Sequence, residues 1–149
     1  MKKLLYLFFF WLIVSCEKEE ATSQIYIDSD ILIEVQEITV SSEKKVVLNC
    51  STEKIYDCSN YYIDLAQEKS ADSITVDFNG ISPDEICAPA LSPAQTKINL
   101  GSLINGFYPL TLKIKQVENN SLLTVTDSQI HLDFPQQDGI RILNPVYTR

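Results

Sequence analysis

Apolar and polar residues alternate with a period of two along most of the chain from residue 25 onward. This period is typical of β-strands that bury one face. The pattern predicts eight or nine strands and few helices, with one apolar set facing inward on each strand. The sets are Ile31/Ile33/Val35, Val46/Leu48/Cys50, Tyr61/Ile63/Leu65, Ile74/Val76/Phe78, Leu110/Leu112/Ile114, Leu123/Val125, Ile130/Leu132/Phe134 and Ile140/Ile142.

Interruptions of the alternation predict the connections. Polar residues 67–72 and 118–121 indicate turns, and residues 51–57 and the proline-containing residues 81–96 indicate loops, the second a crossover. Ile38 and Val40 have the opposite parity to Val35, which predicts a bulge near residues 36–37. The residues after Ile142 are expected to form a frayed tail.

Residues 103–114 carry the pattern Leu-x-x-Gly-x-Tyr-x-Leu-x-Leu-x-Ile. It resembles the turn and penultimate strand of immunoglobulin-like and fibronectin-III-like sandwiches, over roughly residues 97–125. The resemblance implies an all-β, immunoglobulin-like antiparallel β-sandwich of about eight or nine strands. It also implies that the hydroxyl of Tyr108 braces the preceding corner, and it implies no particular activity.

The N-terminus is a separate segment. Lys2 and Lys3 precede an apolar run of eleven residues, 4–14, which suits a signal peptide and is too short for a spanning helix of about 20 residues. The run ends in Ile13-Val14-Ser15-Cys16, which resembles the lipobox of bacterial lipoproteins. The resemblance implies that Cys16 receives a diacylglycerol, that residues 1–15 are removed, and that the new amine is acylated, with palmitate as an expected chain. The alternative is an ordinary signal peptide with a coincidental cysteine.

Glu17-Lys18-Glu19-Glu20 follows directly. This acidic tetrad resembles the export signal of surface lipoproteins of the Bacteroidetes type, which implies an outer-membrane protein exposed on the cell surface. The alternative is a solvated spacer on a lipoprotein that faces the periplasm. The expected organisation is a signal peptide (1–15), a lipidated cysteine with an acidic tether (16–24) and one β-sandwich domain (25–149).

The whole chain has a formal charge of −8. Loss of Lys2 and Lys3 with the signal leaves ten basic against twenty acidic residues, a charge of −10. Nucleic acids and anionic lipid headgroups require Lys/Arg patches, so the charge argues against both partners.

Three cysteines remain once Cys16 is lipidated, and the compartment outside the inner membrane permits disulfides. The parity of Cys50 points it inward as a free, buried thiol. A hairpin turning near residues 67–72 brings Cys58 and Cys87 to the same end of the domain, which favours a Cys58–Cys87 disulfide. A Cys50–Cys58 disulfide and a three-thiol metal site are the alternatives, and the metal site lacks both a Cys-x-x-Cys pair and a nearby histidine.

No catalytic constellation is recognisable in the sequence. His131 is the only histidine and lies in mid-strand, and no Gly-x-Ser-x-Gly elbow or phosphate-binding glycine loop occurs. We expect no enzyme, no cofactor and no metal site.

Four further residues are candidate sites. Tyr56, Tyr61 and Tyr62 are a candidate contact patch, since tyrosine is enriched at interfaces, and core packing is the alternative. Asp72-Ser73-Ile74 resembles O-glycosylation sites of the same bacterial class, which makes Ser73 the candidate acceptor.

The sequence thus predicts a lipid-anchored envelope protein whose domain is a non-catalytic binding or assembly module. Its partners would be the membrane, through the anchor, and an unknown envelope or extracellular protein; the oligomeric state is open. Two other functions compete with it. One is a protease-inhibitor-like sandwich that presents a loop, and the other is a carbohydrate-binding module, against which the absence of tryptophan after Trp11 counts.

Overall fold

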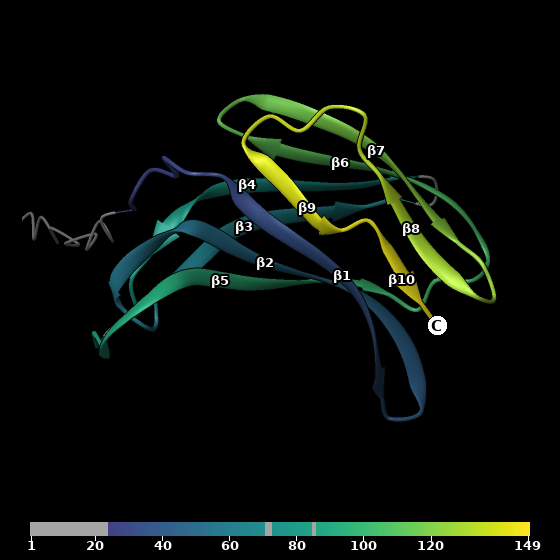
Figure 1. The fold of residues 1–149 in the computed structure, drawn as a ribbon, viewed down its shortest axis with the longest axis horizontal. Coiled ribbons are helices and arrows are strands. Elements are labelled where there is room, and N and C mark those ends of the chain that lie inside the picture. The colour runs from purple at the N-terminus through teal and green to yellow at the C-terminus, as the bar shows by residue number, and fades with distance from the viewer. Residues whose placement is uncertain (1–23, 71–72, 85) are drawn as a thin grey trace, which may run out of the picture.

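The computed structural model describes residues 24–70, 73–84 and 86–149 (Figure 1). The predicted signal peptide, Cys16 and the acidic tetrad therefore lie outside the described residues. The described chain is all-β, as predicted. Its strands are β1 (Ile31–Val40), β2 (Glu43–Cys58), β3 (Tyr62–Lys69), β4 (Ile74–Ser82), β5 (Pro89–Gly101), β6 (Gly106–Ile114), β7 (Val117–Val125), β8 (Gln129–Asp133), β9 (Ile140–Asn144) and β10 (Val146–Thr148). Within these residues, no helix is both long and apolar enough to cross a lipid bilayer.

All ten strands are hydrogen-bonded into one sheet in the order β10-β8-β7-β6-β4-β3-β5-β2-β1-β9. The sheet curls back on itself and encloses a single apolar core (Figure 1). Most neighbouring strands are antiparallel, as expected, but β1–β9, β3–β5 and β4–β6 are parallel. β5 lies between β4 and β6 in the sequence, but in the sheet it lies on the far side of β3. Because the chain runs back through β5, β4 and β6 have the same direction.

The inward-facing residues predicted from the alternation form this core. Ile31, Ile33 and Val35 of β1 are at most 1% exposed, and the predicted sets of β2, β4, β6, β7 and β8 are buried likewise. The expected bulge in β1 is wrong, since β1 pairs with β2 without a register shift from Ile31 to Val40. The end of this hairpin extends beyond the core, and Val40 is exposed there. The side of the strand on which Val40 lies is therefore not fixed by burial.

The segment from β9 to β10, residues 140–148, closes the sheet (Figure 1). β9 pairs with β1 at one edge of the sheet, and β10 pairs with β8 at the other. Between them the Asn144 amide bonds to the backbone of Val35, accepting from its N–H at 2.8 Å and donating to its carbonyl at 2.9 Å. The expected frayed tail is therefore wrong, because both edges hold this segment in place.

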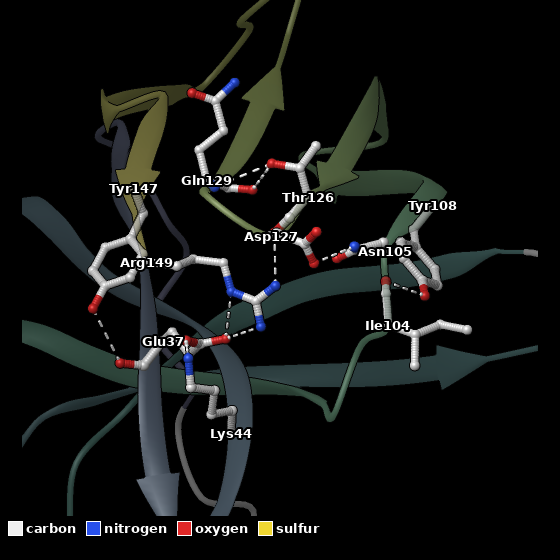
Figure 2. A network of polar contacts seen from close by, with 10 residues as sticks. All are labelled: Glu37, Lys44, Ile104, Asn105, Tyr108, Thr126, Asp127, Gln129, Tyr147 and Arg149. Carbon is white, nitrogen blue, oxygen red and sulfur yellow. Dashed lines mark hydrogen bonds and ion pairs between the residues drawn. The ribbon is translucent and has the colours of Figure 1, made fainter.

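A largely buried ion pair stabilises the same closure, and Figure 2 shows it. The Glu37 carboxylate accepts from Nη2 of Arg149 at 2.6 Å and from its Nε at 3.0 Å. Nη1 of Arg149 donates to the Thr126 carbonyl at 2.7 Å, and Nζ of Lys44 lies 3.2 Å from the second Glu37 oxygen. The Glu37 side chain is only 7% exposed. Burial raises the pKa of Glu37, but the bonds from Arg149 and Lys44 outweigh it and lower the pKa below its ordinary value.

Tyr108 makes the contact that the sandwich resemblance implies. Its hydroxyl donates to the Ile104 carbonyl at 2.9 Å, four residues upstream (Figure 2). The bond fixes the corner through which the chain enters β6.

Replacing Tyr108 with Phe should lower the free energy of unfolding by about 1 kcal/mol, since it deletes one hydroxyl hydrogen bond and keeps the packed ring. Urea unfolding of both proteins, compared at equal m-values, measures the difference. Phe107→Leu, at the exposed neighbour, should leave the midpoint unchanged. A midpoint for Tyr108→Phe within error of the wild type would contradict a bracing role.

Candidate functional site

An open groove of about 580 Å³ lies on the described surface. It crosses the outer face of four neighbouring strands, β9, β1, β2 and β5. Most of its lining residues are polar, and its two leucines come from the neighbouring strands β1 and β9. The lining residues are Leu32, Glu34, Asn49, Cys50, Ser51, Gln95, Thr96, Lys97 and Leu143.

Strand register places these side chains in two rows. Leu32 lies opposite Ser51 and Ser51 opposite Gln95, while Glu34 lies opposite Asn49 and Asn49 opposite Lys97. Residues directly opposite each other in a ladder point to the same face. The outward positions of three strands therefore form a small polar grid, because the alternate positions are taken by the core.

Charges and amides within the grid are ordered across the strands. Nδ2 of Asn49 donates to Oε1 of Gln36 at 2.8 Å, which fixes the plane of the amide. Glu34 and Lys97 flank Asn49 on its two sides. A ligand that spans the second row would meet an acceptor, an amide and a cation in sequence, which suits a ligand with several hydroxyl or amide groups.

Two features frame the groove. At the β9 side, Nη2 of Arg141 lies 3.2 Å from the Asp30 carboxylate and 3.0 Å from the Glu53 carboxylate. At the β5 side, Tyr62 is paired with Gln95 in the parallel ladder and is exposed. Tyr62 thus offers an aromatic ring beside the first row.

The predicted three-tyrosine patch is wrong as a single surface. Tyr56 is 7% exposed and packs against Tyr61, with ring centroids 5.1 Å apart. Nζ of Lys54 covers the Tyr56 ring at 5.5 Å. Only Tyr62 faces outward, because residues 51–57 are part of β2 and Tyr56 keeps the inward parity of Cys50. The loop expected at residues 51–57 is accordingly wrong as well.

The cysteines are arranged as the hairpin argument predicted. Cys58 and Cys87 form a disulfide, and Cys50 is a buried free thiol. Burial raises the pKa of Cys50 to about 12, so it is a poor nucleophile at neutral pH. The disulfide joins the end of β2 to the segment before β5, which pins the connection that follows β4.

Ser73 is exposed and lies immediately before β4. Its amide donates to Oγ of Ser70 at 3.0 Å, and the two hydroxyls are 3.0 Å apart. Asp72, the first residue of the glycosylation-like pattern, lies outside the described residues. O-glycosylation of Ser73 stays a prediction.

Among the described residues, no group of three or more His, Cys, Asp or Glu side chains could hold a metal ion. His131 lies half-buried in mid-strand on β8, opposite Thr124 and Val146. Sequence reasoning missed the groove, since its residues become neighbours only through the pairing of β1, β2, β5 and β9. Outward polar alternation was the available signal, and it is the same for any solvated face.

Comparison with protein-family models, with curated proteins and with solved structures finds no match for this chain. Function is therefore inferred from the residues and their geometry.

Proposed function

We propose that this chain is a lipid-anchored protein of the outer membrane, exposed on the cell surface, whose β domain is a non-catalytic binding or assembly module. The observation that carries the proposal is the N-terminal pattern: two lysines, an apolar run of eleven residues, then Ile13-Val14-Ser15-Cys16. Two or more acyl chains on Cys16 would hold the protein stably in a bilayer, whereas one would not.

The anchor is tested by the intact mass of the protein purified from its own membranes. The expected mass is that of residues 16–149 plus a diacylglyceryl group and an amide-linked acyl chain, and the protein should enter the detergent phase of Triton X-114. The matched control is Cys16→Ala, whose intact mass should lack both lipid groups. An unmodified Cys16 thiol, or aqueous partition of the wild type, would refute the proposal.

The side of the membrane is tested separately by protease treatment of intact cells. Surface exposure predicts cleavage without opening the outer membrane. Protection in intact cells, combined with cleavage after the outer membrane is opened, would assign the protein to the periplasmic face.

The groove is where we place the binding function. It is an open groove of about 580 Å³, it spans four strands, and its polar lining is ordered by the ladder. Ser51 lies in the middle of the first row, so Ser51→Trp would fill the groove. Thr124, half-buried on the outer face of β7, is the matched position away from it.

Crosslinking in intact envelopes, followed by capture of the lipoprotein, should recover the same partner with the wild type and with Thr124→Trp. Ser51→Trp should lose that partner. If Ser51→Trp recovers it at the wild-type level, the groove is not the contact surface.

A carbohydrate-binding module is the second candidate. It is favoured by the lining itself, in which amide, hydroxyl, carboxylate and ammonium groups lie beside the exposed ring of Tyr62. A glycan array would distinguish it: hits that vanish in both Ser51→Trp and Tyr62→Ala would support it, and an array without hits would dismiss it.

A further inference from the structure

Three exposed aliphatic side chains lie toward one end of the domain, and we call them the apolar rim: Ile55, Ile86 and Leu91. Ile86 is 79% and Leu91 is 81% exposed. Ile55 lies opposite Pro93 in the β2–β5 ladder, and Leu91 lies two residues before Pro93 on the same outer face. The rim therefore joins the end of β2, the start of β5 and the segment just before β5.

The chain leaves toward the N-terminus at this same end. Ile25 exchanges two backbone hydrogen bonds of 2.8 Å with Ile81, the residue before the end of β4. β3, which neighbours β4 in the sheet, begins at this end with Tyr62, which pairs with Ser82. Figure 1 shows the purple start of the described chain, from residue 24, and the start of β5 at the left side of the view.

The backbone that presents Ile86 is held firmly. Cys87 is joined to Cys58, and Nδ2 of Asn60 donates to the Ile86 carbonyl. The Ala88 amide donates to Oδ1 of Asn60 at 3.1 Å, and the Ser59 amide donates to the Ala88 carbonyl at 2.9 Å. An aliphatic side chain fixed in a protruding position cannot fold back onto the core, so only a contact from outside can cover it.

We propose that the apolar rim rests on the surface of a zwitterionic phospholipid bilayer. This rests on the proposed lipid anchor. Seven residues separate Cys16 from Gln24, so the two α-carbons are at most about 28 Å apart. The anchor thus holds this end of the domain, and not the opposite one, close to the headgroups, where even a weak apolar contact is favoured by the high local concentration.

The charge of the domain selects the lipid. The chain from Cys16 onward carries −10, and exposed Asp57 lies between Tyr56 and Cys58 beside the rim. Anionic headgroups would repel this surface. A neutral headgroup layer accepts the aliphatic side chains without that cost.

The test uses the mature chain, residues 16–149, which contains no tryptophan. Leu91→Trp places a single reporter on the rim. Phe107→Trp is the matched control, because Phe107 is 72% exposed and lies at the start of β6, which runs parallel to β4 and so begins at the opposite end. Each protein is coupled through Cys16 to a maleimide phospholipid in phosphatidylcholine vesicles. Cys16 is the reactive thiol, since Cys50 is buried and the other two cysteines are paired.

Brominated acyl chains should quench the tryptophan at position 91 at least about threefold more than the one at position 107, and emission at position 91 should shift to shorter wavelength. Equal quenching of the two would overturn the proposal, as would stronger quenching at position 91 on phosphatidylglycerol vesicles than on phosphatidylcholine. The anchor is supplied chemically here, so these outcomes do not depend on whether Cys16 is lipidated in the cell, which the intact mass decides on its own.

Discussion

Replacing Arg149 with Ala should lower the free energy of unfolding by about 2–3 kcal/mol, because it leaves the nearly buried carboxylate of Glu37 with Lys44 as its remaining cation. The loss should also loosen β10, since Arg149 bonds to the Thr126 carbonyl as well. Denaturant unfolding of the wild type and the variant measures the loss directly.

The matched control introduces Glu37→Gln into both the wild type and the Arg149→Ala protein. If the Glu37–Arg149 pair carries the effect, Arg149→Ala should cost much less in the Glu37→Gln protein than in the wild type, which a double-mutant cycle reports as a coupling energy. A loss below about 0.5 kcal/mol for Arg149→Ala alone would place the pair among surface ion pairs of negligible worth.

The same pair gives stability a pH dependence with a definite sign. The pKa of Glu37 is lowered in the folded protein, so the stabilisation is fully present above the ordinary pKa of about 4.5 and is lost as the pH falls from there toward the folded value. Glu37→Gln should flatten this acid limb of the stability profile.

Loss of the disulfide should have the largest effect of the substitutions considered. Cys58 and Cys87 are separated by 29 positions, and in the chain-entropy model a loop of this length contributes about 3–4 kcal/mol. The double variant Cys58→Ser/Cys87→Ser should show that loss in chemical unfolding. Reduction of the wild type should lower the unfolding midpoint by a similar amount.

Thiol labelling supplies the control for this prediction. In the folded, oxidised chain from residue 24 onward, no described thiol should react, because Cys50 is buried. After reduction, two thiols should react quickly and Cys50 only on unfolding. An unchanged midpoint after confirmed reduction would show that the Ser59, Asn60 and Ala88 hydrogen bonds alone hold the segment.

The buried half of the fold was predictable from the sequence, and the connections were less so. The period-two pattern locates the inward residues, because burial of one face is a local property of each strand. Residues 118–121 show the limit. Their polarity indicates a turn, whereas the turn lies at Lys115 and Gln116, both with positive φ, and β7 begins at Val117.

The reason lies in Asn119, a polar residue that is 1% exposed. Its amide donates to the carbonyls of Leu112 at 3.4 Å and Asp138 at 3.1 Å, and accepts from the Asp138 amide at 2.8 Å. A buried amide satisfied from a distant loop cannot be recognised from local composition. The groove was missed for a related cause, since its two rows depend on the pairing of strands that are up to about a hundred residues apart.

The segment from β9 to β10 sets the order in which this protein can be completed. β1, the first strand made, finds its parallel partner only in residues 140–144, and Glu37 finds Arg149 after an interval of 112 residues. Until this segment docks, the β1 and β8 edges of the sheet have no partner among the described strands β1 to β8. Such long-range pairing is slow in the general relation between topology and folding rate, so we expect closure of the sheet by β9 and β10 to be a late step of folding.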